Sequence, residues 1–208
     1  MESVPSTARP SFGVSADGGG NTATAAFIEK GANMLIRLLT GDDWETLKKM
    51  RIEAMEAAPG AFAEVPADWE NMDERQVRAR MSRIDFFVAF DDAGEAVGFM
   101  GLVRQPTSKM AHRATLIMVY LRESARGSGV SKALHEAVMK HARAIGVRQI
   151  ELAVSVENPV AQEFYKRRGY AQIGMVPGGF LHEGREVDEI LMAIRTQVEP
   201  SDTERQKS

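Results

Sequence analysis

The chain has 208 residues, of which 44% are apolar and 26% charged, enough for one well-buried domain but short for two. Its formal net charge of −3 lacks the basic surplus typical of nucleic-acid-binding proteins, and its apolar runs are shorter than the roughly 20 residues that span a bilayer. The absence of cysteine excludes disulfides, thiolate metal sites and a cysteine nucleophile, and fits an intracellular protein. We therefore expect a cytoplasmic protein without nucleic-acid or membrane partners.

Both ends of the sequence are polar. Residues 1–33 are small, polar and glycine-rich, without the basic and apolar regions of a secretory signal, and we predict a disordered N-terminal tail. Because the first strand-like run begins at Met34, we expect the functional domain to start there and the preceding segment to reflect an over-long gene start. Residues 197–208 are a second polar tail, which leaves a domain over 34–196.

Between the tails, hydrophobic periodicity and helix-stop signals predict an ordered series of elements. The expected series, in chain order, is a strand (34–39), a helix (42–58), a weaker helix or mobile segment (68–83), three strands (85–90, 96–103, 114–121), a helix ending at 145, a strand (148–156), a short helix (159–168) and two strands (170–176, 187–194). The three central strands suggest an antiparallel meander, and the part that follows them is a strand, helix, strand unit. The series predicts an α/β (α+β) domain.

A glycine-rich turn, "ARGSGVSKAL" over 125–134, joins the last strand of the meander to the next helix. Glycines there would let an anion approach the unpaired N–H groups of the helix N-terminus. A dinucleotide fingerprint needs a third glycine where this chain has Lys132, and a nucleotide-triphosphate loop needs Gly-Lys-Ser/Thr where it has Ser131, Lys132 and Ala133. Both of these phosphate sites are therefore excluded by spacing.

Three linked motifs resemble those of the GNAT superfamily of acetyl-CoA-dependent N-acetyltransferases. "RGSGVS" (126–131) is similar to the family's Arg/Gln-x-x-Gly-x-Gly/Ala loop, with Ser131 in place of the last small residue. "LAVSVEN" (152–158) and "NPVAQEFYKRRGY" (158–170) are similar to the strand end and helix that follow in the family. The resemblance extends over about Met34 to Ile194.

The resemblance implies a GNAT fold, with a mixed central sheet of about seven strands, splayed central parallel strands and about four helices. It implies direct transfer of an acetyl group from acetyl-CoA, as cosubstrate, to a primary amine of a small molecule or peptide within a ternary complex. The alternative is a non-catalytic acyl-CoA-binding sensor or interaction module of the same fold. Dimers are common in the family, so a homodimer is a further expectation.

The resemblance also assigns candidate site residues. The pyrophosphate of CoA would contact the loop formed by Arg126, Gly127, Ser128, Gly129, Val130, Ser131 and Lys132, in which Arg126 and Lys132 could neutralise charge. The pantetheine arm would lie along the backbone of Val119, Tyr120 and Leu121. Asn158 would contact the same arm, although capping the helix that Pro159 begins would explain it equally well. Tyr165 would give a proton to the departing CoA thiolate; the alternative is a buried tyrosine whose hydroxyl bonds a backbone group.

The general base is not identified by the sequence. Ala153 stands where ribosomal-protein N-terminal acetyltransferases carry a glutamate, and Glu151 and Glu157 flank that position. Three acidic residues, Glu64, Asp68 and Glu70, either read the positive charge of the acceptor or are simply solvated. Trp69 either packs in the core, which we expect, or leans over the acceptor site. The four scattered histidines indicate no metal site.

Overall fold

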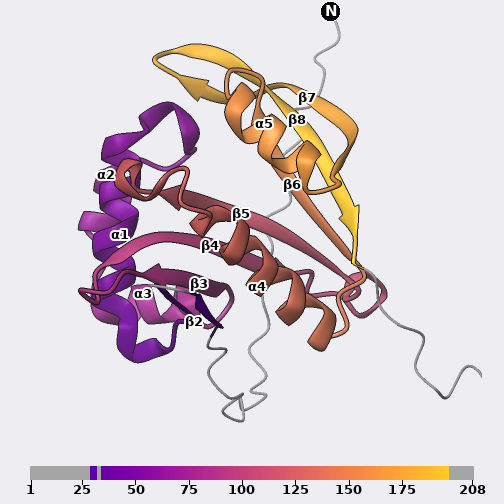
Figure 1. The fold of residues 1–208 in the computed structure, drawn as a ribbon. Coiled ribbons are helices and arrows are strands. Elements are labelled where there is room, and N and C mark those ends of the chain that lie inside the picture. Colours follow the sequence, from indigo (N-terminus) through magenta and orange to yellow (C-terminus); the bar gives the residue numbers. More distant parts are fainter. Residues whose placement is uncertain (1–28, 32–33, 197–208) are drawn as a thin grey trace, which may run out of the picture.

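The computed structural model describes residues 29–31 and 34–196, which form a mixed eight-stranded sheet in the order β1-β2-β3-β4-β5-β6-β8-β7 (Figure 1). The strands are β1 (Glu29–Gly31), β2 (Met34–Leu38), β3 (Asp85–Phe90), β4 (Ala96–Arg104), β5 (Arg113–Leu121), β6 (Gln149–Ser155), β7 (Ala171–His182) and β8 (Arg185–Arg195). Seven of them match the expected strands. The eighth, β1, is paired with β2 and belongs to the segment 1–33 that was predicted to be a tail. The rest of that segment and residues 197–208 lie outside the described residues.

The predicted helix over 68–83 is wrong in one respect, because the structure has two short helices there. They are α2 (Pro66–Glu70) and α3 (Glu74–Met81). The side chain of Asp73 accepts a hydrogen bond from the backbone N–H of Gln76 at 2.8 Å, so it caps a new helix instead of continuing the old one. The other helices, α1 (Trp44–Ala57), α4 (Val130–Ala144) and α5 (Pro159–Arg167), lie close to their predicted bounds.

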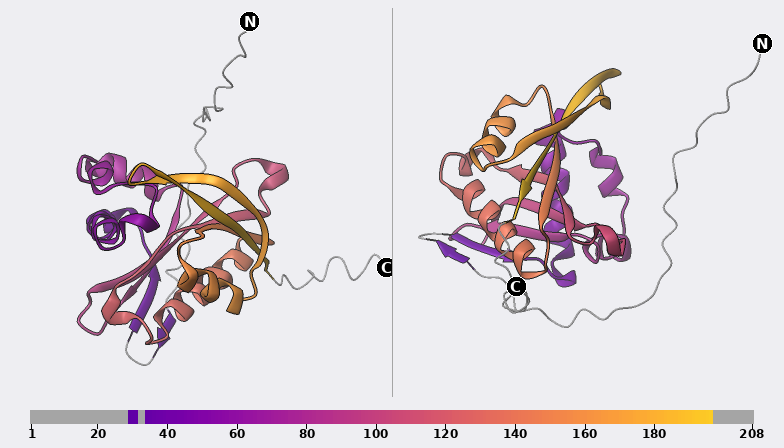
Figure 2. Two further views of the ribbon diagram at one scale, coloured as in Figure 1. Left: turned by 90° about the horizontal axis from the view of Figure 1, so that it is seen from above. Right: turned by 90° about the vertical axis from the view of Figure 1, so that its right-hand side faces the viewer.

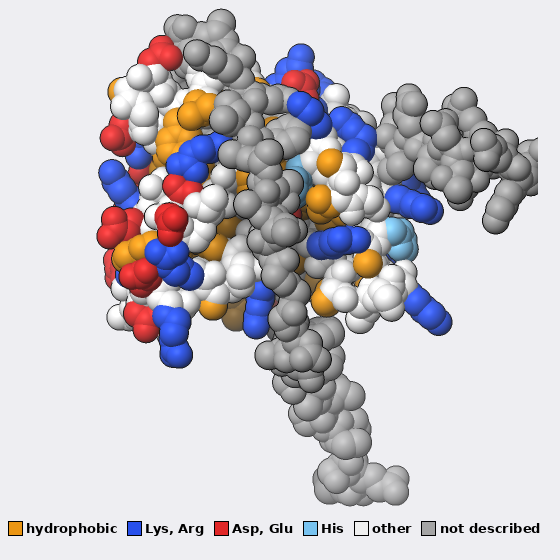
Figure 3. Space-filling model, turned by 90° about the horizontal axis from the view of Figure 1, so that it is seen from below, with side chains coloured by type: hydrophobic (Ala, Val, Ile, Leu, Met, Phe, Trp, Pro, Cys, Tyr) orange, Lys and Arg blue, Asp and Glu red, His pale blue; other side chains and the backbone are white. Residues whose placement is uncertain are grey.

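The helices cover the sheet on both faces (Figures 1 and 2). On one face of the sheet, α4 and α5 pack against the strands. The core there includes Leu134 and Val138 of α4 and Leu152 of β6. On the other face α1, α2 and α3 form a second core that includes Leu47 and Trp69. Charged side chains of both signs cover the outer surface seen in Figure 3. Among the described helices, none is long and apolar enough to cross a membrane.

The two central parallel strands part early. β5 and β6 are paired only where Arg113–Thr115 meets Gln149–Glu151. Beyond these residues β5 stays paired with β4 up to Leu121, while β6 stays paired with β8 up to Ser155. A gap therefore opens in the middle of the sheet, as the splayed strands of the expected fold require.

A bulge in β5 lies at this gap. The β4–β5 register shifts between Phe99 and Gly101, and Met118 on the opposite strand has a positive φ of 52°. Beyond the bulge, the N–H of Arg122 donates to the carbonyl of Val97 in β4. Because successive N–H groups of a strand point to opposite edges, those of Val119 and Leu121 point into the gap.

The last two strands are longer than predicted. They form a hairpin whose turn residues Glu183 and Gly184 both have positive φ, the conformation of a type I′ turn. Pro177, Gly178 and Gly179 interrupt the hydrophobic pattern of β7, so the sequence predicted a strand end at 176. The structure instead accommodates them as a bulge between Val176 and Phe180.

Gly98 permits the close approach of β4 and β5 beside the gap. A Cβ at this position would lie 2.5 Å from Leu121 Cδ1 and 2.9 Å from the Tyr120 carbonyl oxygen. We predict that Gly98→Ala lowers the free energy of unfolding by about 1–3 kcal/mol in urea denaturation, because the added methyl overpacks the pair. Gly174→Ala is the matched control, since its nearest neighbour would be Leu191 Cδ1 at 3.7 Å. Equal stability of the two variants would contradict this account.

Candidate active site

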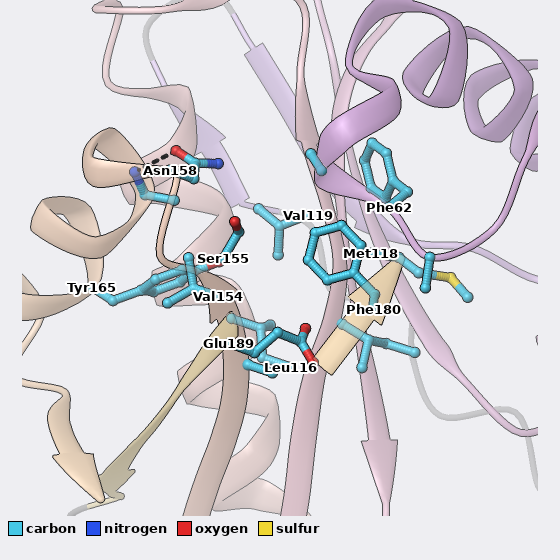
Figure 4. Close-up of a pocket in the computed structure, with 15 residues that line it drawn as sticks. Phe62, Leu116, Met118, Val119, Val154, Ser155, Asn158, Tyr165, Phe180 and Glu189 are labelled. Carbon is cyan, nitrogen blue, oxygen red and sulfur yellow. Dashed lines mark hydrogen bonds between the residues drawn. The ribbon is translucent and has the colours of Figure 1, made fainter. Parts of the chain in front are cut away.

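A cavity of about 160 Å³ lies where β5 and β6 part (Figure 4). Its walls come from β5 and β6, from the loop after α1, from α5 and from the final hairpin. The lining residues are Ala61, Phe62, Ala63, Leu116, Ile117, Met118, Val119, Ala153, Val154, Ser155, Asn158, Ala161, Tyr165, Phe180 and Glu189. The gap between the strands is therefore a cavity with side chains around it.

The cavity has walls on both faces of the sheet. Val154 is buried in the core under α4 and α5, and Tyr165 on α5 belongs to the same core. The neighbouring side chain of Ser155 points to the opposite face, because side chains alternate along a strand. Phe62, from the loop after α1, lies on that opposite side of the cavity, across from Tyr165 (Figure 4).

The glycine-rich loop presents free N–H groups at the start of α4. Gly127 and Gly129 have positive φ of 76° and 89°, and a Cβ added to either would meet no atom within 4 Å. The first intrahelical bond runs from the N–H of Ala133 to the carbonyl of Gly129 at 3.0 Å, and no side chain caps the helix. The N–H groups of Val130 and Ser131, like that of Lys132, thus precede the first helical donor and can meet an anion.

The side chains of the loop differ in their surroundings. The Ser128 hydroxyl donates to the carbonyl of Ala125 at 2.6 Å and so stabilises the loop itself. Arg126 is exposed, and Lys132 lies 3.7 Å from Glu136 on the outer face of the helix. Both cations are near the free N–H groups in sequence and can turn toward an anion bound there.

Tyr165 is 6% exposed, and its ring packs edge-on against those of Phe164 and Tyr170 at centroid distances of 5.3 and 5.5 Å. Burial raises the pKa of its hydroxyl, which therefore stays protonated at neutral pH. Among the described residues, none hydrogen-bonds this hydroxyl, although the residue lines the cavity. Tyr165 is therefore a buried hydrogen-bond donor that has no partner among the described residues.

Asn158 and the end of β5 complete this side of the site. The Asn158 side chain accepts a hydrogen bond from the N–H of Ala161 at 3.0 Å, which confirms the predicted helix cap, and it also lines the cavity (Figure 4). The hydroxyl of Tyr120 contacts Glu53 at 3.2 Å, on the α1 side of the sheet. Of the three predicted β5 residues, Val119 lines the cavity, and the N–H groups of Val119 and Leu121 face the gap.

The chain matches the model of the acetyltransferase (GNAT) family over residues 45–170. It belongs to the GNAT acetyltransferase family. It is 33% identical over 96 residues to an uncharacterized N-acetyltransferase of Methanocaldococcus jannaschii, a match that covers 45% of this chain and 42% of that protein. The chain spans about half the length of the curated relatives it matches.

Solved GNAT structures share the fold. An acetyltransferase of the GNAT family from Streptococcus pneumoniae superimposes with a TM-score of 0.69 at 19% identity, over 78% of this chain and 99% of that one. A GNAT superfamily phosphinothricin acetyltransferase from Sinorhizobium meliloti, solved in complex with AcCoA, gives 0.66 at 20% identity, over 82% and 94%. These likenesses agree with the expected sheet and its splayed centre.

The two acids that flank Ala153 are engaged elsewhere. Glu151 binds Arg113 at 2.6 Å, an interaction that lowers the pKa of its carboxyl, and Glu157 binds Arg185 at 2.7 Å. Neither lines the cavity. Neither acid is therefore placed to act as a base in this cavity, and the general base stays unidentified.

The three acids of the acceptor-side loop also lie outside the cavity. Glu64 binds Arg51 at 2.8 Å and the Trp69 indole at 3.0 Å, and it contacts Arg80. Asp68 accepts from the N–H of Val65 and caps α2, and Glu70 is exposed. Trp69 is fully buried, which confirms its predicted packing role.

This cluster has an indirect connection to the site through Arg51, which is 1% exposed. Its guanidinium lies over the ring of Phe62 at 4.9 Å, so the Arg51–Glu64 pair supports one wall of the cavity. Within the described ranges there is no group of three or more His, Cys, Asp or Glu side chains placed to hold a metal ion.

Sequence reasoning missed the acid that does line the cavity, Glu189. Its nearest neighbours on the same face of β8, Val187 and Leu191, are both apolar. A single acid in an apolar series was the available signal. Phe62, Ser155 and Phe180 were also missed, because a strand or loop position says nothing about a cavity until the strands have been placed.

Behind Tyr165 lies a buried histidine. The Nε2 atom of His135 is 3.2 Å from the Tyr170 hydroxyl, within hydrogen-bond distance, and the rings of Tyr170 and Tyr165 are in contact. Burial, and secondarily the charge of Arg168, lowers the pKa of His135 to about 4. The imidazole is therefore neutral at pH 7 and belongs to the packing that holds Tyr165.

This pKa predicts a pH dependence of stability. Between the ordinary value of 6.5 and about 4, the unfolded chain binds a proton at His135 that the folded chain does not. The free energy of unfolding should therefore fall as the pH falls through this window, by about 3 kcal/mol from this group alone. In His135→Gln the free energy of unfolding should depend less on pH over this window. In His112→Gln, at an exposed position, it should depend on pH as in the wild-type protein. Parallel curves for wild type and His135→Gln would contradict the assignment.

Proposed function

We propose that this protein transfers an acetyl group from acetyl-CoA directly to a primary amine of a small molecule or peptide. The observation that carries the proposal is the cavity at the parting of β5 and β6. The buried phenol of Tyr165, which has no hydrogen-bond partner among the described residues, lines one face, and Phe62 and Ser155 line the other. Membership of the GNAT family supports it, as does the AcCoA complex of the similar Sinorhizobium meliloti fold.

The residues present fit the cosubstrate. Gly127 and Gly129 leave space above the loop, and the free N–H groups of Val130, Ser131 and Lys132 offer donors to a pyrophosphate. Arg126 and Lys132 supply positive charge. Together these features support assignment of the predicted loop, residues 126–132, to the phosphate end of CoA.

The gap between the strands fits an extended arm. The N–H groups of Val119 and Leu121 have no strand partner on that side, so they can pair with the amides of pantetheine as with an added strand. Asn158 lies at the opposite wall, where its capped side chain still borders the cavity. This supports a contact with the same arm.

Bound acetyl-CoA would supply an activated acetyl thioester, whose transfer leaves a thiolate. Tyr165 is the group in the cavity wall that can donate a hydrogen bond to that thiolate, since its raised pKa keeps the phenol protonated, and proton transfer to the thiolate would be completed as CoA leaves. Direct transfer within a ternary complex requires no thiol of the enzyme. It is therefore compatible with a chain that has no cysteine.

The competing hypothesis is a non-catalytic CoA-binding module. The unpartnered Tyr165 hydroxyl favours the enzyme, because a phenol needed only for packing would gain from a hydrogen-bond partner. Release of free thiol from acetyl-CoA, measured against a panel of primary amines and peptides, separates the two. CoA binding without thiol release across the panel would favour the binding module.

Tyr165→Phe should lower kcat by about 100-fold, because the proton donor is lost. The KM for acetyl-CoA and the melting temperature should change little, since the hydroxyl has no partner among the described residues. Tyr170→Phe is the matched control: it removes a hydroxyl that faces His135 and does not line the cavity, so it should reduce stability and leave turnover nearly unchanged. Wild-type turnover in Tyr165→Phe would remove the proposed role.

Ser131→Leu should raise the dissociation constant for CoA about tenfold or more, measured by calorimetry, because the bulk lies at the anion-binding end of α4. The side chain is only partly buried, so the melting temperature should stay within about 2 °C of the wild type. Ser124→Leu, at an exposed position just before the loop, controls for added apolar surface. Unchanged CoA affinity in Ser131→Leu would place the phosphates elsewhere.

A further inference from the structure

Glu189 differs from the other partly buried glutamates near the site. Glu53, Glu64 and Glu151 each bind an arginine at 2.8 Å or less, and in each case the pKa of the carboxyl is lowered. The Glu189 carboxylate lines the cavity and, among the described residues, has neither an ion pair nor a hydrogen bond. A half-buried carboxylate without a partner is costly to keep unless a ligand supplies one.

The hairpin is shaped to hold this carboxylate. A Cβ at Gly179 would lie 2.5 Å from Glu189 Oε2 and 2.7 Å from its Cγ, so only glycine leaves room for the side chain. The adjacent Gly178 has a positive φ of 57°, and its N–H donates to Asp188 Oδ1 at 2.8 Å, which fixes the bulge of β7. The same bulge brings Phe180 to the cavity beside Glu189 (Figure 4).

Strand register places Glu189 on the face of the sheet opposite Tyr165. Glu189 is paired with Ser155, and Ala153 is its diagonal neighbour on β6, so all three share the face away from α5. Tyr165 lies on the α5 side of the same cavity. A molecule that enters past Glu189 therefore meets the gap from the face opposite the proton donor.

The remaining wall defines what fits beside the carboxylate. Phe62, Met118 and Phe180 are apolar, and no Lys, Arg or His occurs among the described lining residues. A cation carried on an apolar stem would be complementary to this wall. An amine that also bears a carboxylate would meet Glu189 with like charge and find no compensating cation.

We infer that Glu189 is the acceptor-recognising residue of this site, where it forms an ion pair with the ammonium of a primary amine on an apolar stem. The inference rests on the proposed function and narrows its acceptor to cationic amines without a neighbouring carboxylate. The amine and Tyr165 then lie on opposite faces of the gap, so the incoming and departing groups do not compete for one space.

The test uses a matched pair of probes, 2-phenylethylamine and L-phenylalanine, which differ only by the α-carboxylate. Each is titrated by calorimetry into the full-length protein saturated with CoA. The wild type should bind 2-phenylethylamine at least about tenfold more tightly than L-phenylalanine. Glu189→Gln should weaken the binding of 2-phenylethylamine about tenfold or more and narrow the difference between the probes.

Glu186→Gln is the control, because Glu186 is an exposed acid on the opposite face of the same strand and does not line the cavity. It should bind both probes like the wild type, and melting curves of both variants should confirm that each is folded. Equal binding by wild type and Glu189→Gln, or no binding of 2-phenylethylamine by the wild type, would overturn the inference.

Amine binding by calorimetry and thiol release from acetyl-CoA, measured side by side, separate this inference from the proposed function. Amine binding that depends on Glu189, without release of thiol from acetyl-CoA, would leave the recognition role standing and refute the acetyl transfer. Turnover of amines with the same KM in wild type and Glu189→Gln would support the acetyl transfer and refute the recognition role of Glu189.

Discussion

The whole site depends on how little β5 and β6 pair. Three residues of each strand form the parallel ladder, and beyond them the strands keep their outer partners and separate. Unpaired backbone groups in a sheet interior need another partner, and beyond Thr115 and Glu151 neither strand supplies one to the other. The fold thus keeps open a slot, the cavity between β5 and β6. Unpaired backbone groups of β5 border it on one edge, and a few side chains line the rest.

The slot separates two environments. On the α5 side, Tyr165 packs against the rings of Phe164 and Tyr170, which in turn contact a neutral His135. Burial in these surroundings keeps the phenol protonated. On the other side, Glu189 adds one negative charge to an apolar wall. The phenol and the carboxylate thus line one small cavity from opposite faces of the sheet.

Much of this fold could be predicted from local pattern, and the site only in part. The loop at Gly127 and Gly129, the cap at Asn158 and the placement of Tyr165 follow from short, contiguous motifs whose geometry is fixed within a few residues. Glu189 could not be placed in this way, because its position at the cavity depends on cross-strand register with Ser155 and on a bulge in β7. At that bulge the sequence, with Pro177, predicted the end of a strand. The arginine partners of Glu151 and Glu157 were likewise invisible, since they are distant in sequence.

The strand order has a consequence for how the chain is made. β8 lies between β6 and β7, and each of these neighbours depends on it for most of its ladder. During synthesis, β6, α5 and β7 therefore emerge before the strand that joins them, and β6 meanwhile has only its three residues of pairing with β5. The first half of the domain can assemble around the meander early, whereas the wall with Glu189 is complete only once residues 185–195 have left the ribosome. Interruption of translation shortly before β8 would thus produce a chain with a formed anion loop and an unfinished slot.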